Sequence, residues 1–264
     1  MKLGLTSAAF YGRMETDEAA EFLPSLGLDT CEVFLESFSE YTADFGRIVR
    51  EKLGALPCAS VHPKGTQFEP DLFGQSERQR ADAFALASGV MDAGRALGAS
   101  YYVFHGPVSC LGRITLEKIH ALEAHFARLQ QEAQAHGMEL LWENVSYGAV
   151  NCIDDFRYIR ERLPELHFVL DLKQAWRVGA DPLDFLHELG GAVRHVHLLD
   201  RADNGAICLP GQGAYDLDRF VRTLHDQGYT GALIIEPYAY QTTDMEALRR
   251  SIGFMQELLV KVGE

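Results

Sequence analysis

Eight short apolar runs recur along the chain, and longer amphipathic stretches separate them. The runs are residues 2–6, 30–35, 58–61, 101–104, 139–142, 167–170, 194–198 and 232–235. Most of them are nearly continuous apolar segments rather than strict alternations of apolar and polar residues. This pattern is typical of parallel strands that are buried on both faces, so we expect eight such strands.

The stretches between these runs have the spacing of helices. Apolar residues recur at helical intervals in residues 15–26, 75–97, 116–136 and 248–262. Strict alternation of strands and helices over 264 residues predicts an α/β fold, a single (β/α)₈ TIM-barrel domain over residues 1–264. A doubly wound open sheet is the rival fold, but it usually has a glycine-rich phosphate turn after its first strand. Residues 6–12 contain one glycine, Gly12, at their end.

Ionisable side chains stand where six successive predicted strands end. They are His62, His105, Glu143, Asp171, the pair His195 and His197 with Asp200, and Glu236. Ordinary loop polarity would supply serine, asparagine, lysine and glycine, whereas this set contains only histidine, aspartate and glutamate. The carboxyl ends of barrel strands meet at one mouth, where active sites lie. The pattern therefore predicts a metal or acid/base site at that mouth.

Four of these residues suit a divalent metal ion. Glu143, Asp171, His197 and Glu236 supply three carboxylates and one imidazole, a set that fits Mn²⁺, Mg²⁺ or Co²⁺ and leaves Zn²⁺ open. Apolar residues such as Trp142 precede the ligands and predict a partly dry pocket. Such a pocket raises carboxylate pKa values, while a bound metal ion keeps its ligands ionised.

The charge and composition of the chain limit the kinds of partner and the cellular location that we expect. The net charge of −14 argues against a nucleic-acid partner, because phosphate affinity is built from lysine and arginine. No run of 18 apolar residues occurs, so we expect no membrane span, and we read the N-terminus as a strand rather than a signal peptide. Five cysteines without a C-x-x-C motif predict reduced thiols in a cytoplasmic protein.

Short motifs in strand order carry a family resemblance. They are Phe104-His-Gly106, Trp142-Glu-Asn144, Leu170-Asp171, His195-Val-His-Leu198, Leu209-Pro-Gly-Gln-Gly213 and Ile235-Glu-Pro237. Together they resemble the xylose isomerase-like TIM-barrel superfamily, which includes sugar isomerases and epimerases, inosose dehydratases and endonuclease IV-type enzymes. The resemblance covers nearly the whole chain.

The resemblance implies a metal-dependent sugar or sugar-phosphate isomerase or epimerase. It makes Glu143, Asp171, His197 and Glu236 the shared metal site. It also makes Glu143 and Glu236 the acid/base pair that works through an enediolate. The substrate is then a small carbohydrate, and a homo-oligomer is left open. An inosose-type dehydratase and an endonuclease IV-like phosphodiesterase are the alternatives on the same metal site.

Two positions depart from the sugar-binding members of this superfamily. Gln174 stands where they carry the histidine of an Asp-x-x-His motif, and Gln212 replaces the glutamate of a Pro-Gly-Glu-Gly loop. Glutamine is a poor metal ligand, so a third ion is not expected. We expect His62, His105, Lys173 and Gln174 to contact the substrate. A second ion at His62 and His105, shared with Glu143, remains the alternative for the two histidines.

Overall fold

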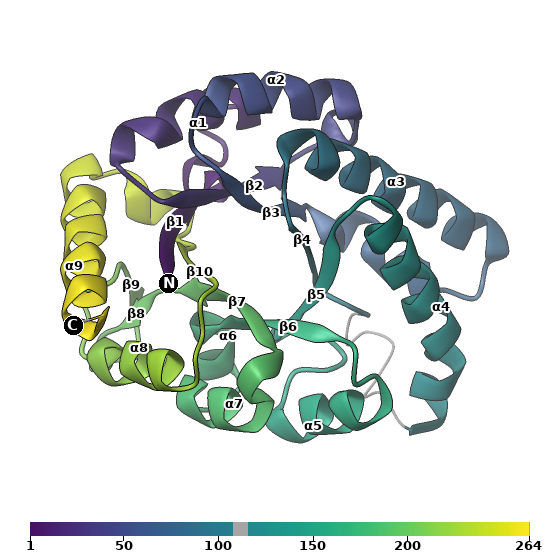
Figure 1. Cartoon of the computed structure of the whole chain (residues 1–264). Helices are drawn as coiled ribbons and strands as arrows, with labels where there is room; N and C mark the ends of the chain where they lie inside the picture. The colour runs from purple at the N-terminus through teal and green to yellow at the C-terminus, as the bar shows by residue number, and fades with distance from the viewer. Residues whose placement is uncertain (108–115, 264) are drawn as a thin grey trace.

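The eight expected strands close into one parallel barrel in the computed structural model, which describes residues 1–107 and 116–263 and omits the side chains of 116–122. Each strand pairs with its neighbour in the chain, and the last pairs with the first (Figure 1). The barrel strands are β1 (Lys2–Thr6), β2 (Thr30–Leu35), β3 (Cys58–Pro63), β4 (Tyr101–Phe104), β5 (Glu139–Glu143), β6 (His167–Asp171), β7 (Val193–Leu198) and β10 (Ala232–Ile235). The (β/α)₈ prediction is confirmed.

Helices surround the barrel and connect its strands (Figure 1). They are α1 (Thr16–Phe22), α2 (Ala43–Leu53), α3 (Glu77–Leu97), α4 (Leu116–Ala135), α5 (Ile153–Arg162), α6 (Leu172–Arg177), α7 (Pro182–Leu189), α8 (Leu217–Asp226) and α9 (Met245–Gly263). The helix expected over residues 15–26 changes after Phe22 into a 3₁₀ turn, η2 (Leu23–Leu26). Pro24 lacks a backbone N–H, which accounts for the change.

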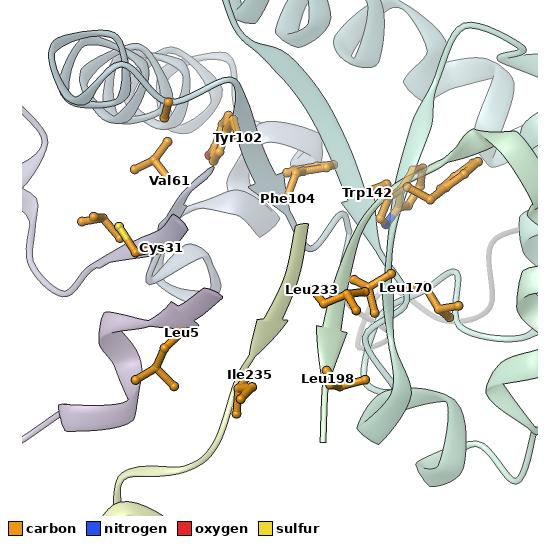
Figure 2. Packing of buried hydrophobic residues seen from close by; sticks show 14 of the residues in the cluster. Leu5, Cys31, Val61, Tyr102, Phe104, Trp142, Leu170, Leu198, Leu233 and Ile235 are labelled. Carbon is orange, nitrogen blue, oxygen red and sulfur yellow. The ribbon is translucent and has the colours of Figure 1, made fainter. Parts of the chain in front are cut away.

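Two packing layers share the barrel strands. The larger layer lies outside the barrel, against the helices. Figure 2 shows part of this layer and labels ten of its residues, including Val61, Trp142, Leu170 and Ile235. Successive strand residues point to opposite faces of a sheet. The residue after each of these four therefore points inward, and those residues are His62, Glu143, Asp171 and Glu236. Outer packing thus sets the direction of the site residues.

The remaining connections include short elements that the apolar pattern does not reveal. An antiparallel hairpin, β8 (Asp200–Arg201) with β9 (Ile207–Cys208), follows β7. The 3₁₀ turns are η1 (Ser7–Phe10), η3 (Phe38–Glu40), η4 (Gly65–Gln67), η5 (Glu69–Phe73), η7 (Gly190–Ala192) and η8 (Ala239–Thr242).

The cysteines and the lengths of the helices bear on two expectations from the sequence, reduced thiols and the lack of a membrane span. Cys31, Cys58 and Cys208 are free thiols, and Cys110 lies outside the described residues. Among the helices that the structure describes, none is long and apolar enough to cross a membrane.

Candidate metal centre

The four side chains expected to bind a metal ion come together at the carboxyl ends of adjacent barrel strands. Glu143 and Asp171 end β5 and β6, His197 is the penultimate residue of β7, and Glu236 follows β10. Each offers one ligand atom, and these atoms all lie within 4.8 Å of one another. The Nδ1 atom of His197 is 3.5 Å from both Glu143 Oε1 and Glu236 Oε2. The strand-end pattern therefore predicted a real spatial cluster.

Local hydrogen bonds hold these residues in place. The Asn144 side chain donates to the Asp171 carbonyl at 3.0 Å and accepts from the Asp171 N–H at 2.6 Å, which joins the ends of β5 and β6. Asp171 Oδ1 also accepts from the backbone N–H of Gln174 and caps α6. The Glu236 N–H donates to the carbonyl of Leu198 at 3.2 Å.

Three ligand atoms are buried without a hydrogen-bond partner in the described part of the chain. They are Glu143 Oε2, Asp171 Oδ2 and His197 Nδ1. Buried polar atoms are nearly always satisfied, so three orphans from three of the four ligands need a common explanation. A divalent cation held by these side chains would supply the missing partners. The donor set thus fits a metal ion that prefers oxygen and imidazole ligands.

Lys173 lies among the carboxylates. Its Nζ donates to Glu236 Oε2 at 2.8 Å and is 3.3 Å from Asp171 Oδ2, and only 6% of its side chain is exposed. Gln174 lies next to the cluster, but its Oε1 accepts from the backbone N–H of Ser146 at 3.1 Å. This hydrogen bond engages the side-chain oxygen of Gln174 and not its NH₂ group.

The two histidines from β3 and the end of β4 converge on the far side of Glu143. His62 Nε2 and His105 Nε2 are 3.1 Å apart, and they lie 3.5 Å and 3.3 Å from Glu143 Oε2. His62 Nδ1 lies 2.8 Å from the carbonyl of Pro63, which can only accept, so Nδ1 carries a proton. His62, His105 and Glu143 form a second group with the spacing of metal ligands.

The side chains shift one another's protonation. Burial raises the pKa of Asp171 to about 8, with Lys173 opposing the shift and Glu236 and Glu143 adding to it. Burial also favours a neutral Glu143, but His197, His105 and His62 outweigh it and hold the pKa of Glu143 well below its ordinary range. Opposite charges favour the ionised form and like charges disfavour it, which explains the divergence between the two carboxylates.

The buried carboxylates also shift the pKa values of His197 and His62. Burial would lower the pKa of His197, whereas Glu32, Glu236 and Glu143 together hold it well above its usual value. The same competition, with Glu143 and Glu32 as the main carboxylates, raises the pKa of His62 to about 9. The carboxylates therefore attract positive charge to the mouth.

Two buried carboxylates near the site were missed. Glu32 is fully buried inside the barrel and contacts His197, and Glu69 accepts from the His105 backbone N–H at 3.1 Å. Glu32 could have been recognised from the sequence, because it is a charged residue within the apolar run 30–35. Glu69 begins η5 between two strands, and no sequence pattern distinguishes it.

Cavities lie at both ends of the barrel. A cavity of about 280 Å³ opens beside the ligands and is lined by Glu236, Lys173, Lys64, Tyr11 and Tyr238, among others. A larger hollow of about 620 Å³ is lined by residues at the strand starts, including Lys2 and Tyr101, and by none of the expected ligands. Of these two cavities, the smaller one reaches the cluster, at Glu236.

Comparisons with known proteins agree with this architecture. Residues 20–258 match the family model of the xylose isomerase-like TIM barrel. The fructoselysine 3-epimerase of Escherichia coli O157:H7 is 22% identical over 253 residues, which cover 89% of this chain and 90% of that protein.

Solved structures share the fold over almost their whole length. A D-tagatose 3-epimerase-like protein has a TM-score of 0.81 at 18% identity and covers 100% of this chain and 98% of its own. The IOLI protein with a binding zinc atom has a TM-score of 0.76 at 19% identity, with 99% and 98% covered. With a family model that spans most of its length, this chain belongs to the xylose isomerase-like TIM-barrel family.

Proposed function

We propose that this chain is a divalent-metal-dependent sugar epimerase or isomerase. The observation that carries the proposal is the convergence of three orphaned, buried ligand atoms at the barrel mouth. Relatives with 3-epimerase names support the reaction class, and they include fructoselysine 3-epimerase and a D-psicose 3-epimerase solved in the presence of D-fructose.

Glu143, Asp171, His197 and Glu236 would hold the ion. A bound divalent ion would polarise the substrate carbonyl and its neighbouring hydroxyl. The chain supplies the proton transfers. One of Glu143 and Glu236 removes the proton from the carbon beside the carbonyl, which leaves an enediolate. The other returns a proton to the opposite face and inverts that carbon.

The surroundings of Glu143 and Glu236 suit proton transfer to and from a substrate. Glu236 has a side chain 16% exposed and lines the small cavity, whereas Glu143 is 2% exposed and lies deeper. A positioned carboxylate contributes about 10²–10⁴-fold to a proton-transfer step. Lys173 lines the same cavity, whereas Gln174, His62 and His105 lie close to Asp171 and Glu143. We assign these four residues to contacts with the substrate hydroxyls and carbonyl.

A second ion at His62, His105 and Glu143 is the alternative role for those histidines. The separation of 3.1 Å between their Nε2 atoms supports either use. Titration with Mn²⁺ distinguishes them, since one ion per chain leaves both histidines free for substrate.

The test is a panel of 2-ketoses and polyol-derived ketones, with and without phosphate, incubated with the metal-loaded protein in D₂O and followed by NMR. We expect one substrate to exchange the C–H next to its carbonyl for deuterium and to yield its epimer or isomer. Loss of water from the product would instead establish the dehydratase alternative. No exchange on any panel member would count against the proposal.

Glu143→Gln is the matched variant for this assay. It keeps a side chain of the same size but cannot take a proton. We expect its turnover to fall by about 10²-fold or more, while circular dichroism stays that of the parent protein.

A further inference from the structure

A fully buried polar cluster lies inside the barrel, beneath the metal centre. Glu32, Ser60 and His195 come from β2, β3 and β7, and all three have no exposed surface. Burial of a carboxylate costs free energy unless hydrogen-bond donors surround it. The contacts that compensate for the burial of Glu32 are therefore of interest.

One oxygen of Glu32 collects the donors. Glu32 Oε2 accepts from Ser60 Oγ at 2.8 Å and lies 3.1 Å from His197 Nε2 and 3.3 Å from His195 Nε2. The other ring nitrogen of His197, Nδ1, faces Glu143 and Glu236 and has no hydrogen-bond partner among the described residues. The imidazole of His197 therefore links the buried carboxylate to the metal centre.

We infer that Glu32 is the positioning residue of the metal centre. Its Oε2 accepts a hydrogen bond from the Nε2–H of His197, and this leaves the Nδ1 lone pair directed at the ion and fixes the plane of the ring. The inference rests on the proposed metal-dependent function. Ser60 and His195 orient the carboxylate through contacts with the same oxygen.

The spacing of Glu32, His195 and His197 also resembles a ligand group of its own. Two observations favour hydrogen bonding instead. Ser60 already donates to Glu32 Oε2, and the cluster has no exposed surface through which an ion would enter. In addition, a neutral imidazole has one lone pair, so His197 cannot serve an ion on each side without losing its last proton.

A carboxylate behind a metal-bound histidine raises the basicity of the ligand and fixes its tautomer. Removal of such a partner typically costs 10–100-fold in metal affinity or activity. We expect Glu32→Gln to weaken Mn²⁺ binding by about 10–100-fold. The amide removes the negative charge, and it can present an N–H that favours the wrong tautomer.

The experiment is calorimetric titration of the purified full chain with Mn²⁺, for the parent, Glu32→Gln and a matched control. Glu40→Gln is that control, because Glu40 is also a buried carboxylate that accepts hydrogen bonds, from Thr16 Oγ1 and the Glu36 N–H, and it contacts none of the four ligands. We expect the control to change Mn²⁺ affinity less than twofold. Thermal unfolding verifies that each variant is folded.

A folded Glu32→Gln variant that binds Mn²⁺ as tightly as the parent overturns the inference, and so does an equal loss in Glu40→Gln. If Glu32→Gln does not fold, Glu32→Asp takes its place. The aspartate keeps the charge but withdraws it by one methylene, so a smaller loss of affinity is expected, and an unchanged affinity overturns the inference.

A second readout is the histidine tautomer in the zinc-loaded protein, from long-range ¹H–¹⁵N NMR. We expect the proton on Nε2 of His197, and a proton on Nδ1 contradicts the inference. Neither readout needs turnover. Failure to find a sugar substrate therefore counts against the proposed function alone, and unchanged metal binding in Glu32→Gln counts against the role of Glu32 alone.

Discussion

Protonation of individual residues should control how the proposed metal centre takes up an ion. His197 has a pKa held well above its usual value, and the pKa of Asp171 is raised to about 8. Before an ion binds at neutral pH, the carboxyl group of Asp171 is therefore protonated, and both ring nitrogens of His197 are protonated. Metal ligands must be deprotonated, so binding has to displace those protons.

Metal affinity should accordingly fall as the pH is lowered. Each proton that is released makes the affinity weaken about tenfold per pH unit below the pKa of its group. We expect proton release in Mn²⁺ titrations at pH 7, measured by calorimetry in buffers of different ionisation enthalpy. An affinity that is the same at pH 6 and pH 8 would contradict the protonation states described above.

In the proposed centre, Lys173 would compete with the ion for the same oxygens. Its ammonium contacts Glu236 Oε2 and Asp171 Oδ2, so an incoming cation meets a positive charge that is almost fully buried. We expect Lys173→Met to bind Mn²⁺ several-fold more tightly and to raise KM for the sugar, because a substrate contact is lost.

Lys64→Met is the matched control for that variant. Lys64 lines the same cavity, but its Nζ donates to Tyr11 Oη rather than to a ligand carboxylate. Its removal should leave Mn²⁺ affinity within twofold of the parent. Weaker ion binding in Lys173→Met would show that the ammonium supports the site instead of competing with it.

At the scale of elements, the loop after β7 is organised by one carboxylate. Asp200 Oδ2 accepts from the backbone N–H groups of Gly211 and Gly213, and Oδ1 accepts from those of Arg201 and Tyr215. The glycine-rich loop therefore turns its amides to Asp200, and these four are not free for a phosphate group. A Cβ at position 213 would lie 2.3 Å from Asp200 Oδ1, which explains the glycine there.

Loss of this carboxylate should destabilise the fold. Asp200→Ala leaves several N–H groups without their charged acceptor, and we expect the free energy of unfolding to fall by about 2–3 kcal/mol. Chemical denaturation measures the change. Asp203→Ala, an exposed aspartate of the same hairpin, is the control and should differ from the parent by less than about 0.5 kcal/mol. Equal stabilities of the two variants would exclude the role of Asp200.

Sequence patterns predicted elements and ligands to different extents. All eight barrel strands, and the clustering of the four candidate ligands, followed from apolar runs that end in acidic residues or histidine, because barrel closure brings such ends together. The hairpin of β8 and β9 has only two residues in each strand, too few for a periodic signal. Glu69 was missed because its contact with His105 joins the start of η5 to the residue after β4, 36 positions away.

At the scale of the whole molecule, the acidic charge and the closed barrel favour a small substrate over a polyanion. The net charge is −14, and the small cavity beside the ligands has a volume of about 280 Å³. The position where sugar-binding members carry a histidine is Gln174, whose oxygen is occupied by the Ser146 N–H. These features argue against an endonuclease IV-like site with three ions.

The metal-loaded protein should therefore leave an abasic DNA duplex intact. Repulsion between phosphates and the acidic surface disfavours binding, and a third ion has no ligand at Gln174. Denaturing gel electrophoresis after incubation with Mn²⁺ or Zn²⁺ checks this expectation. Cleavage at the abasic position that Glu143→Gln abolishes would establish the phosphodiesterase alternative.

The most direct test of the four-ligand centre is a crystal structure of the Mn²⁺-loaded protein with an anomalous difference map. We predict a peak within bonding distance of Glu143, Asp171, His197 Nδ1 and Glu236, with Lys173 displaced from Asp171. A map with no peak among these four side chains, or with its strongest peak elsewhere in the molecule, would contradict the account.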